Sequence, residues 1–157
     1  MRLLDAQAGE HILDVGCGSG ELTAKIASLV GTTGSVVGTD VSEDMIRAAK
    51  AGMSSISTSG ASLKLSYDIA DGCSLSDWVQ ADSIRRAGQF DKVFSSAAMH
   101  WMIRAPERVV EGVWQALKPG GVFAAEMGGF MNVIGVRGHL HYVLKKYGVD
   151  PKTVDPW

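Results

Sequence analysis

Short apolar runs alternate with longer stretches of helical period along the chain. Five of the runs are brief enough to predict strands, at residues 11–15, 35–39, 63–67, 90–95 and 122–127. Between them, apolar residues recur every three or four positions, which is typical of helices with one buried face. This regular alternation predicts βαβ units, and therefore an α/β fold with a mainly parallel sheet and right-handed crossovers.

Individual residues predict where these elements lie and end. Ser42 is placed to cap the second helix, and residues 54–60 are expected to form a surface loop. Strict alternation of apolar and polar positions over residues 63–67 predicts a strand at a sheet edge, with one face in water. The helix over residues 109–117 has apolar positions at helical spacing, so we assign its Trp114 to the core.

The last part of the chain predicts one further helix. Asn132 is placed to cap it, and Gly148 and Pro151 stop it. Its expected apolar face consists of Val133, Val136, Leu140, Val143 and Leu144.

Parallel sheets of this kind bind ligands beyond the carboxyl ends of their strands. We therefore expect five groups to converge at one edge: the turn after Val15, Asp40, Asp68, Ser95–Ser96 and Glu126. These groups include most of the residues whose side chains could bind a ligand or take part in catalysis.

Composition narrows the class of protein further. The 157 residues are 46% hydrophobic and 20% charged, as in an ordinary soluble domain, and their formal net charge of −2 argues against nucleic acid or an anionic membrane as the main partner. No apolar run approaches the length that spans a bilayer, and the first ten residues do not resemble a signal peptide. Two cysteines, Cys17 and Cys73, form neither a disulfide framework nor a metal-binding pair. We expect a cytoplasmic protein without a metal.

The glycine-rich turn after the first strand is the most informative motif. A strand that runs into Gly16-x-Gly18-x-Gly20 and then a helix lets the main chain approach a ligand closely, with free N–H groups at the helix start. A dinucleotide fingerprint would need glycine where Glu21 stands. A carboxylate beside a pyrophosphate is unfavourable, which counts against binding of NAD.

Asp40 ends the second strand, where a carboxylate can accept charge-assisted hydrogen bonds from two ribose hydroxyls. The alternative is that Asp40 begins a turn and caps the next helix. Its pairing with the glycine turn favours the ribose role.

The run from Ile12 to Gly20 resembles the first motif of class I S-adenosylmethionine-dependent methyltransferases. Residues 37–42, 67–71, 90–101 and 117–121 resemble the second to fifth motifs in family order, so that the resemblance covers residues 11 to about 127. The resemblance implies a Rossmann-like, doubly wound sheet of strand order 3-2-1-4-5. It also implies S-adenosyl-L-methionine as cofactor, with Asp14 at its amino-acid end, Asp40 at the ribose, Val41 and Ile69 beside the adenine, and Asp68 at the adenine amino group. The residues assigned to the cofactor are Asp14, Gly16, Cys17, Gly18, Gly20, Asp40, Val41, Met45, Asp68, Ile69 and Ser95. Asp71 has a simpler role as a turn residue before Gly72.

The fourth motif places two candidate substrate residues after the fourth strand. It is similar to the form found in trans-aconitate-type methyltransferases, and implies that His100 and Trp101 position the acceptor. A packed loop, with Trp101 in the core and His100 in solvent, is the alternative for both. Glu126 could face the site or lie at an exposed strand end.

The resemblance implies methyl transfer to a small-molecule acceptor, and a carboxylate oxygen is the expected target because it is already ionised at neutral pH. Two alternatives remain: a non-catalytic cofactor-binding fragment and an NAD-dependent oxidoreductase. Family members have two more strands and additional N-terminal helices, so we expect residues 1–157 to be a single domain truncated at both ends, with an exposed fifth strand. The pattern offers no role for the insertion at residues 74–88.

Overall fold

A computed structural model of the chain describes residues 3–56, 63–82, 86–129 and 134–154. Five parallel strands form one sheet in the order β3-β2-β1-β4-β5. They are β1 (His11–Val15), β2 (Ser35–Asp40), β3 (Leu65–Ile69), β4 (Phe90–Ser96) and β5 (Leu117–Glu126). The parallel sheet, its strand order and the edge position of the third strand are confirmed.

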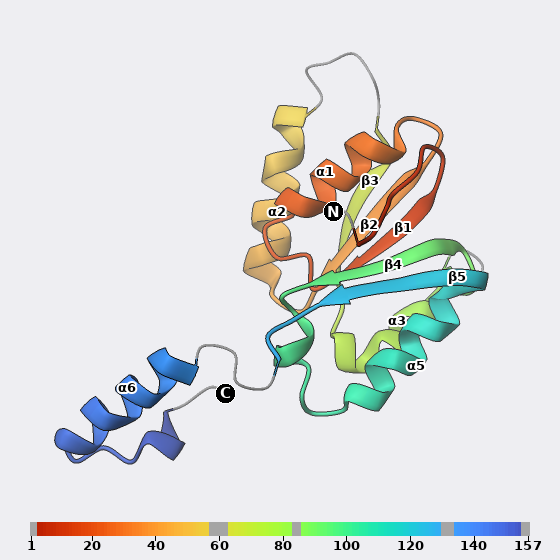
Figure 1. The fold of residues 1–157 in the computed structure, drawn as a ribbon. Coiled ribbons are helices and arrows are strands. Elements are labelled where there is room, and N and C mark those ends of the chain that lie inside the picture. The colour runs from red at the N-terminus through yellow and green to blue at the C-terminus, as the bar shows by residue number, and fades with distance from the viewer. Residues whose placement is uncertain (1–2, 57–62, 83–85, 130–133, 155–157) are drawn as a thin grey trace. The chain divides into compact units, whose positions relative to one another are not determined.

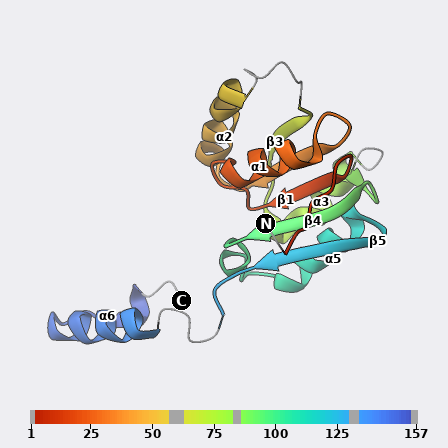
Figure 2. The same ribbon diagram turned by 45° about the horizontal axis from the view of Figure 1, so that its top comes forward.

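Helices cover the two faces of the sheet. Figures 1 and 2 show α1 (Glu21–Val30) and α2 (Glu43–Ile56) on one side, and α3 (Leu75–Ala81) and α5 (Pro106–Ala116) on the other. Successive residues of β1 point to opposite faces, so Ile12 packs with α1 while Leu13 packs with α3 and α5. Short 3₁₀ turns, η2 (Gly72–Ser74) and η3 (Met99–Trp101), follow β3 and β4. The prediction of a loop was wrong for residues 54–56, because α2 extends to Ile56. Residues 57–60 of the predicted loop lie outside the described ranges.

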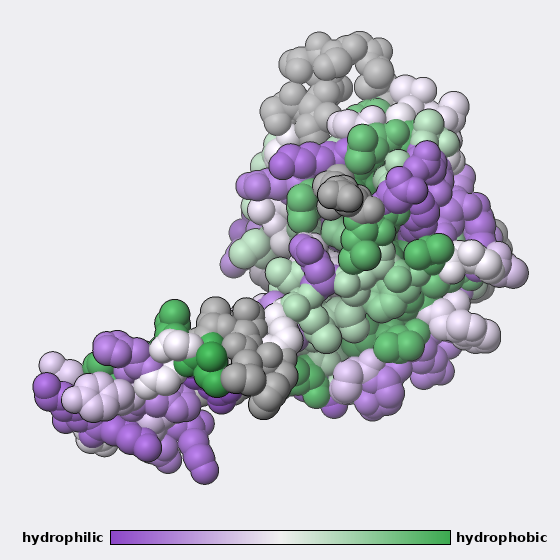
Figure 3. All heavy atoms as spheres, viewed as in Figure 1, coloured by the Kyte–Doolittle hydropathy of each residue, from purple (hydrophilic) through white to green (hydrophobic). Residues whose placement is uncertain are grey.

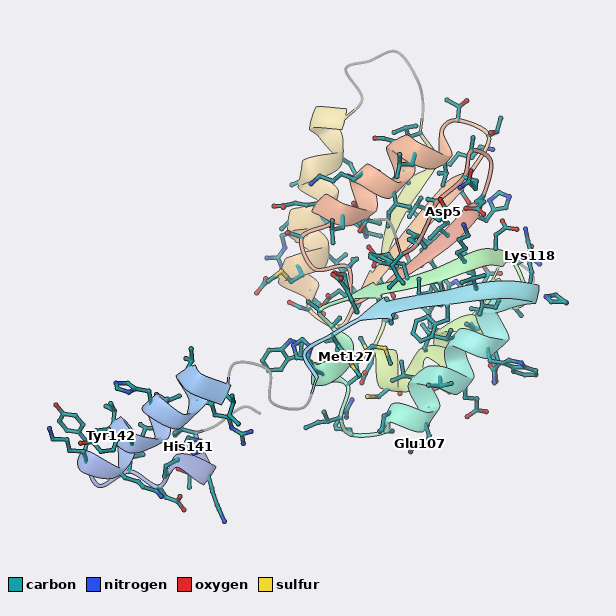
Figure 4. All side chains as sticks on the ribbon, in the orientation of Figure 1. Asp5, Glu107, Lys118, Met127, His141 and Tyr142 are labelled. Atoms are coloured by element: carbon teal, nitrogen blue, oxygen red, sulfur yellow. The ribbon has the colours of Figure 1, made fainter. Side chains whose placement is uncertain are left out.

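The strand β5 is longer than predicted. Helix α5 ends at Ala116, and pairing begins at once, with Leu117 opposite Phe90. A register irregularity then follows before Lys92 pairs with Val122. Lys118 Nζ is 2.7 Å from Asp91 Oδ1, and this ion pair holds the irregular start of β5 against β4. Figure 4 labels Lys118 and Met127 near the two ends of the strand.

One edge of the sheet is formed by β5, and the other is formed by β3. Hydrophobic surface is exposed over β4 and β5 in Figure 3, and Val122 belongs to the exposed apolar residues. An uncovered strand edge favours association with another strand.

Trp114 does not belong to the core, and the prediction was wrong. Its side chain is 76% exposed, and Val110, one turn earlier, is also exposed. The buried stripe of α5 consists of Val109, Val113 and Ala116, with Gly112 between them. Two neighbouring stripes of the helix are apolar, and the sheet and α3 cover one of them.

The insertion at residues 74–88 contains α3 and a side-chain cluster that fastens it to β3. Asp68 accepts hydrogen bonds from Trp78 Nε1 and Arg86 Nη2, at 3.3 and 3.0 Å. The guanidinium of Arg86 also lies 4.1 Å from the centre of the Trp78 ring. Arg86 therefore makes a cation–π contact with Trp78 and a charge-assisted hydrogen bond to Asp68.

The described residues divide into two compact units, Met1–Met127 and Gly128–Trp157. The second contains α6 (Ile134–Lys146) and η4 (Pro151–Thr153). None of the described α6 side chains is buried, including Val136 and Leu140 of the predicted apolar face and the labelled His141 and Tyr142 in Figure 4. The predicted cap Asn132 and Val133 lie outside the described residues. The single-domain assignment stays a prediction.

Gly112→Ala tests the packing of α5 against α3. A Cβ at this position would lie 2.6 Å from Leu75 Cβ and 2.8 Å from Ser76 N. The clash with the main chain of α3 cannot be relieved by rotation of a side chain. Overpacking outweighs the gain in helix propensity, so we expect a loss of about 1–3 kcal/mol in the free energy of unfolding. Gly52→Ala in α2, where a Cβ meets nothing within 4 Å, is the control and should gain about 0.5–1 kcal/mol. Equal effects in urea denaturation would contradict this packing.

Candidate functional site

The glycine turn joins β1 to α1 at the carboxyl edge of the sheet. Gly16, Gly18 and Gly20 have φ values of 77°, 54° and 81°, in the left-handed region that side chains disfavour. A Cβ on Gly16 would overlap the Ala98 side chain, and one on Gly20 would overlap the Tyr67 hydroxyl. Gly18 instead faces open space within 4 Å. Close packing therefore requires two of these glycines, and the third leaves room beside the turn.

The Asp40 carboxylate connects this turn to the end of β2. Asp40 Oδ2 accepts a hydrogen bond from Gly18 N at 3.0 Å, and Oδ1 accepts one from Ser42 N at 2.9 Å. Thr39 O accepts two more from the turn, from Gly16 N and Cys17 N. Ser42 Oγ accepts from Met45 N at 3.3 Å, which confirms Ser42 as the cap of α2. Main-chain donors thus fix the orientation of the Asp40 carboxylate.

Asp14 is a buried carboxyl group behind the turn. Its side chain is 2% exposed, and Thr23 Oγ1 of α1 donates to Asp14 Oδ2 at 2.7 Å. Burial raises the pKa of Asp14 to about 6; the Thr23 hydrogen bond opposes this shift and the charge of Asp40 adds to it. Burial also raises the pKa of the Cys17 thiol to about 12, helped by the charges of Asp14 and Asp40. The thiol is therefore protonated at neutral pH and is not a nucleophile.

Two adjoining cavities open at this edge of the sheet. We call the first, of about 390 Å³, the turn cavity, and the second, of about 300 Å³, the edge cavity. Both are lined by Gly16, Asp40, Ala98 and Trp101. The turn cavity adds Asp14, Cys17, Gly18, Ser19, Glu21, Leu22, Met45, Ser96 and Ala97. The edge cavity adds Val41, Ala70, Asp71, Gly72, Cys73, Met102 and Arg104.

Carboxylates dominate the charge of these walls. Asp14, Glu21 and Asp40 line the turn cavity, and no Lys or Arg is among its described lining residues. The edge cavity has Asp40 and Asp71 together with Arg104. Carboxylates gathered around a cavity favour a cationic ligand over an anionic one.

The structure brings most of the predicted site residues to these cavities. Those that line one or both are Asp14, Gly16, Cys17, Gly18, Asp40, Val41, Met45 and Trp101. Those that line neither are Gly20, Asp68, Ile69, Ser95 and His100.

The residues outside the lining have other contacts. The Asp68 carboxylate is held by Trp78 and Arg86, and buried Ser95 donates from Oγ to Val15 O at 2.8 Å. His100 lies beside Trp101, with the ring centres 5.0 Å apart. Trp101 is 60% exposed, so it does not fill the core.

Several lining residues were not predicted. Asp71 was assigned to a turn, and it does accept from Cys73 N at 2.9 Å at the start of η2. It also lines the edge cavity and pairs with Arg104. Met102 packs so closely that a Cβ on Gly72 would overlap its sulfur. The position of Asp71 within the third motif could have indicated that it lines the site. No sequence motif marks Met102 or Arg104 as a lining residue.

The end of β4 forms the wall between the cavities and β5. Ser96 Oγ donates to Glu126 Oε1 at 2.7 Å, and Ala97 N donates to Glu126 O at 2.9 Å. Ala97 has a φ of 51°, unusual for a residue other than glycine. Ser96 and Glu126 therefore meet as predicted for converging strand ends.

The described residues contain no group of three or more His, Cys, Asp or Glu that could hold a metal ion. Nor does any helix among them have the length and apolar character that a membrane crossing needs.

Comparison with known proteins identifies a family. The methyltransferase-domain family matches residues 12–121. An uncharacterized methyltransferase of Schizosaccharomyces pombe is 34% identical over 163 residues, covering 100% of this chain and 56% of the relative. A trans-aconitate 2-methyltransferase of Deinococcus radiodurans is 32% identical over 117 residues, covering 74% and 37%. A crystal structure of an S-adenosylmethionine-dependent methyltransferase from Mesorhizobium loti has a TM-score of 0.62 at 28% identity, covering 81% of this chain and 50% of that one. The chain thus spans about half of these relatives or less.

Asp14→Asn tests the buried carboxyl group. The pKa of Asp14 is higher in the folded chain than its ordinary value of 3.8, so the native state binds more protons between about pH 4 and 6. The contribution of Asp14 to the free energy of unfolding therefore falls as the pH rises through this window, by about 3 kcal/mol at most. Relative to wild type, the Asn variant should gain stability by that order from pH 4 to 7 in denaturant titrations. Exposed Asp44→Asn is the control, and parallel wild-type and Asp14→Asn curves would contradict the assignment.

Proposed function

Because this chain belongs to the methyltransferase-domain family, we propose that its two cavities hold S-adenosyl-L-methionine and that the site transfers the methyl group to a small-molecule acceptor. The carboxylate-rich wall of the turn cavity carries this proposal. S-adenosylmethionine has an ammonium group and a sulfonium group, both cationic, and Asp14, Glu21 and Asp40 complement them. The pyrophosphate of NAD would face the same carboxylates, which disfavours the oxidoreductase alternative.

The residues present fit this cofactor. Each Asp40 oxygen already accepts one main-chain hydrogen bond and has a second lone pair for a ribose hydroxyl. Open space beside Gly18 accommodates the amino-acid end near Asp14. The exposed apolar side chains of Val41 and Met45 offer surface for the adenine ring.

For the adenine amino group, the geometry favours Asp71 over Asp68. Asp71 lines the edge cavity beside Val41 and Cys73. The Asp68 carboxylate accepts from two side chains of the insertion and lines neither cavity. We therefore assign adenine recognition to Asp71, and assign Asp68 to the attachment of α3 and its following segment.

When bound, the cofactor supplies a methyl group activated by its positive sulfur. The chain has to align the acceptor with that methyl group and exclude water, and alignment alone contributes about 7–11 kcal/mol in favourable cases. Trp101 lines both cavities, where an aromatic face can shield a cationic centre and the acceptor. His100, next to it, is the second positioning candidate.

We propose a carboxylate oxygen as the methyl acceptor. An ionised carboxylate needs no general base. This suits a site in which the Cys17 thiol is protonated, Asp40 is engaged with main-chain donors, and Asp14 is buried and accepts from Thr23. The name of the trans-aconitate 2-methyltransferase relative supports a carboxylic acid substrate.

Three aspartate-to-asparagine variants test the cofactor assignment through affinity for S-adenosylhomocysteine, the product form of the cofactor. Asp40→Asn should weaken binding about 30- to 300-fold, because charge-assisted hydrogen bonds to two hydroxyls are lost. Asp71→Asn should weaken it about 5- to 20-fold by the loss of one such bond. Asp68→Asn is the matched control and should stay within about twofold of wild type. Equal effects of Asp68→Asn and Asp71→Asn would contradict the adenine assignment, and normal affinity of Asp40→Asn would contradict the ribose assignment.

Transfer from methyl-labelled cofactor to a panel of small acids, amines and phenols tests the acceptor. We expect label in base-labile esters of di- or tricarboxylic acids and none in the amines or phenols. Methylation of amines or phenols alone would contradict a carboxylate acceptor. Cofactor binding without transfer to any panel member would favour the non-catalytic alternative.

A further inference from the structure

An ion pair joins two segments across the edge cavity. Arg104 Nη2 donates to Asp71 Oδ2, and both residues line the cavity. Asp71 follows β3, whereas Arg104 lies between η3 and α5, 33 residues later. The Arg104 side chain is 73% exposed, so its position depends on this contact more than on packing.

Met102 brings the two segments together beneath the ion pair. Its side chain packs against Gly72 so closely that no Cβ fits there, and its methyl carbon lies 3.3 Å from a Cβ built on Gly16. The segment that carries Arg104 is thereby anchored to the glycine turn and to η2. Arg104 can reach Asp71 because its main chain is held two residues earlier.

The two aspartates of the edge cavity are oriented differently. Asp40 has a main-chain N–H on each oxygen, from Gly18 and Ser42. Asp71 Oδ1 accepts from the main-chain N–H of Cys73, whereas Oδ2 accepts from the side chain of Arg104. Main-chain donors keep their place when side chains move. The orientation of the Asp71 carboxylate therefore depends in part on a side-chain donor, whereas main-chain donors hold both oxygens of Asp40.

We propose that Arg104 is a positioning residue for recognition of the nucleoside base: it holds Asp71 so that the second lone pair of Oδ2 faces the exocyclic amine of adenine. This inference rests on the proposed function and extends it to a residue outside the motifs. Among the described residues that line the two cavities, Arg104 is the single basic side chain of the Lys or Arg type. Its contact with Asp71 gives it a defined partner. Carboxylate oxygens have two lone pairs, so Asp71 can accept from Arg104 and from the base together.

The test compares two nucleoside ligands on the 157-residue chain by calorimetry: S-adenosylhomocysteine and S-inosylhomocysteine, which has a carbonyl oxygen in place of the amine. In wild type, Asp71 should favour the adenine ligand at least about tenfold, the size of one charge-assisted hydrogen bond. Arg104→Ala should lower the affinity for the adenine ligand about 3- to 10-fold and reduce the preference to about threefold or less. Arg104→Lys should recover part of it, since a lysine restores a charge without the planar fork.

The control variant is Arg108→Ala, since Arg108 makes a comparable exposed ion pair with Asp77, at 3.7 Å, and lines neither cavity. It should leave both affinities unchanged. Thermal unfolding of each variant separates a loss of binding from a loss of fold.

A double-mutant cycle completes the test. If Arg104 acts through Asp71, Arg104→Ala in the Asp71→Asn background should have little further effect on adenine preference. An Arg104→Ala variant that keeps its preference, loses affinity equally for both ligands or binds more tightly would overturn the inference; tighter binding would mean that Arg104 competes with the base. Absence of binding by wild type would instead count against the proposed function.

Discussion

Two main-chain N–H groups, from Gly18 and Ser42, hold the Asp40 carboxylate at the carboxyl ends of β1 and β2. The glycine turn can donate to it because Gly18 adopts a positive φ without a side chain. The same turn brings Cys17, Glu21 and the buried Asp14 around one cavity. The site thus depends on a carboxylate whose orientation the backbone fixes before any ligand arrives. Such preorganisation lowers the entropy lost on binding.

The strand pattern predicted the sheet well because four of its strands are short, apolar and separated by helices of clear period. The pattern was less informative where two apolar stripes share one helix. In α5, the residues at 109, 113 and 116 and those at 110 and 114 both have helical spacing, and only tertiary packing selects the first set. The start of β5 was missed for a different reason. Pro119 and Gly120 usually end an element, yet here the chain pairs with β4 on both sides of them.

The site was predictable where one local motif contains its residues, as from Asp14 to Gly18 and at Asp40. It was not predictable where contacts between distant segments decide. Asp68 and Asp71 stand three positions apart, and the choice between them depends on Trp78, Arg86 and Arg104, which lie 7 to 36 residues away. Thr23 was likewise hidden, because a threonine on the buried side of a helix has no pattern that assigns it to Asp14.

We propose that a cavity walled by Asp14, Glu21 and the backbone-held Asp40 selects a cationic adenosine cofactor. Calorimetric titration of the wild-type chain with S-adenosylmethionine and, in parallel, NADH tests it most directly. We expect one site per chain for S-adenosylmethionine with micromolar affinity or better, about 8 kcal/mol of binding free energy, and no measurable heat with NADH. Binding of NADH in preference to S-adenosylmethionine, or of neither, would contradict it.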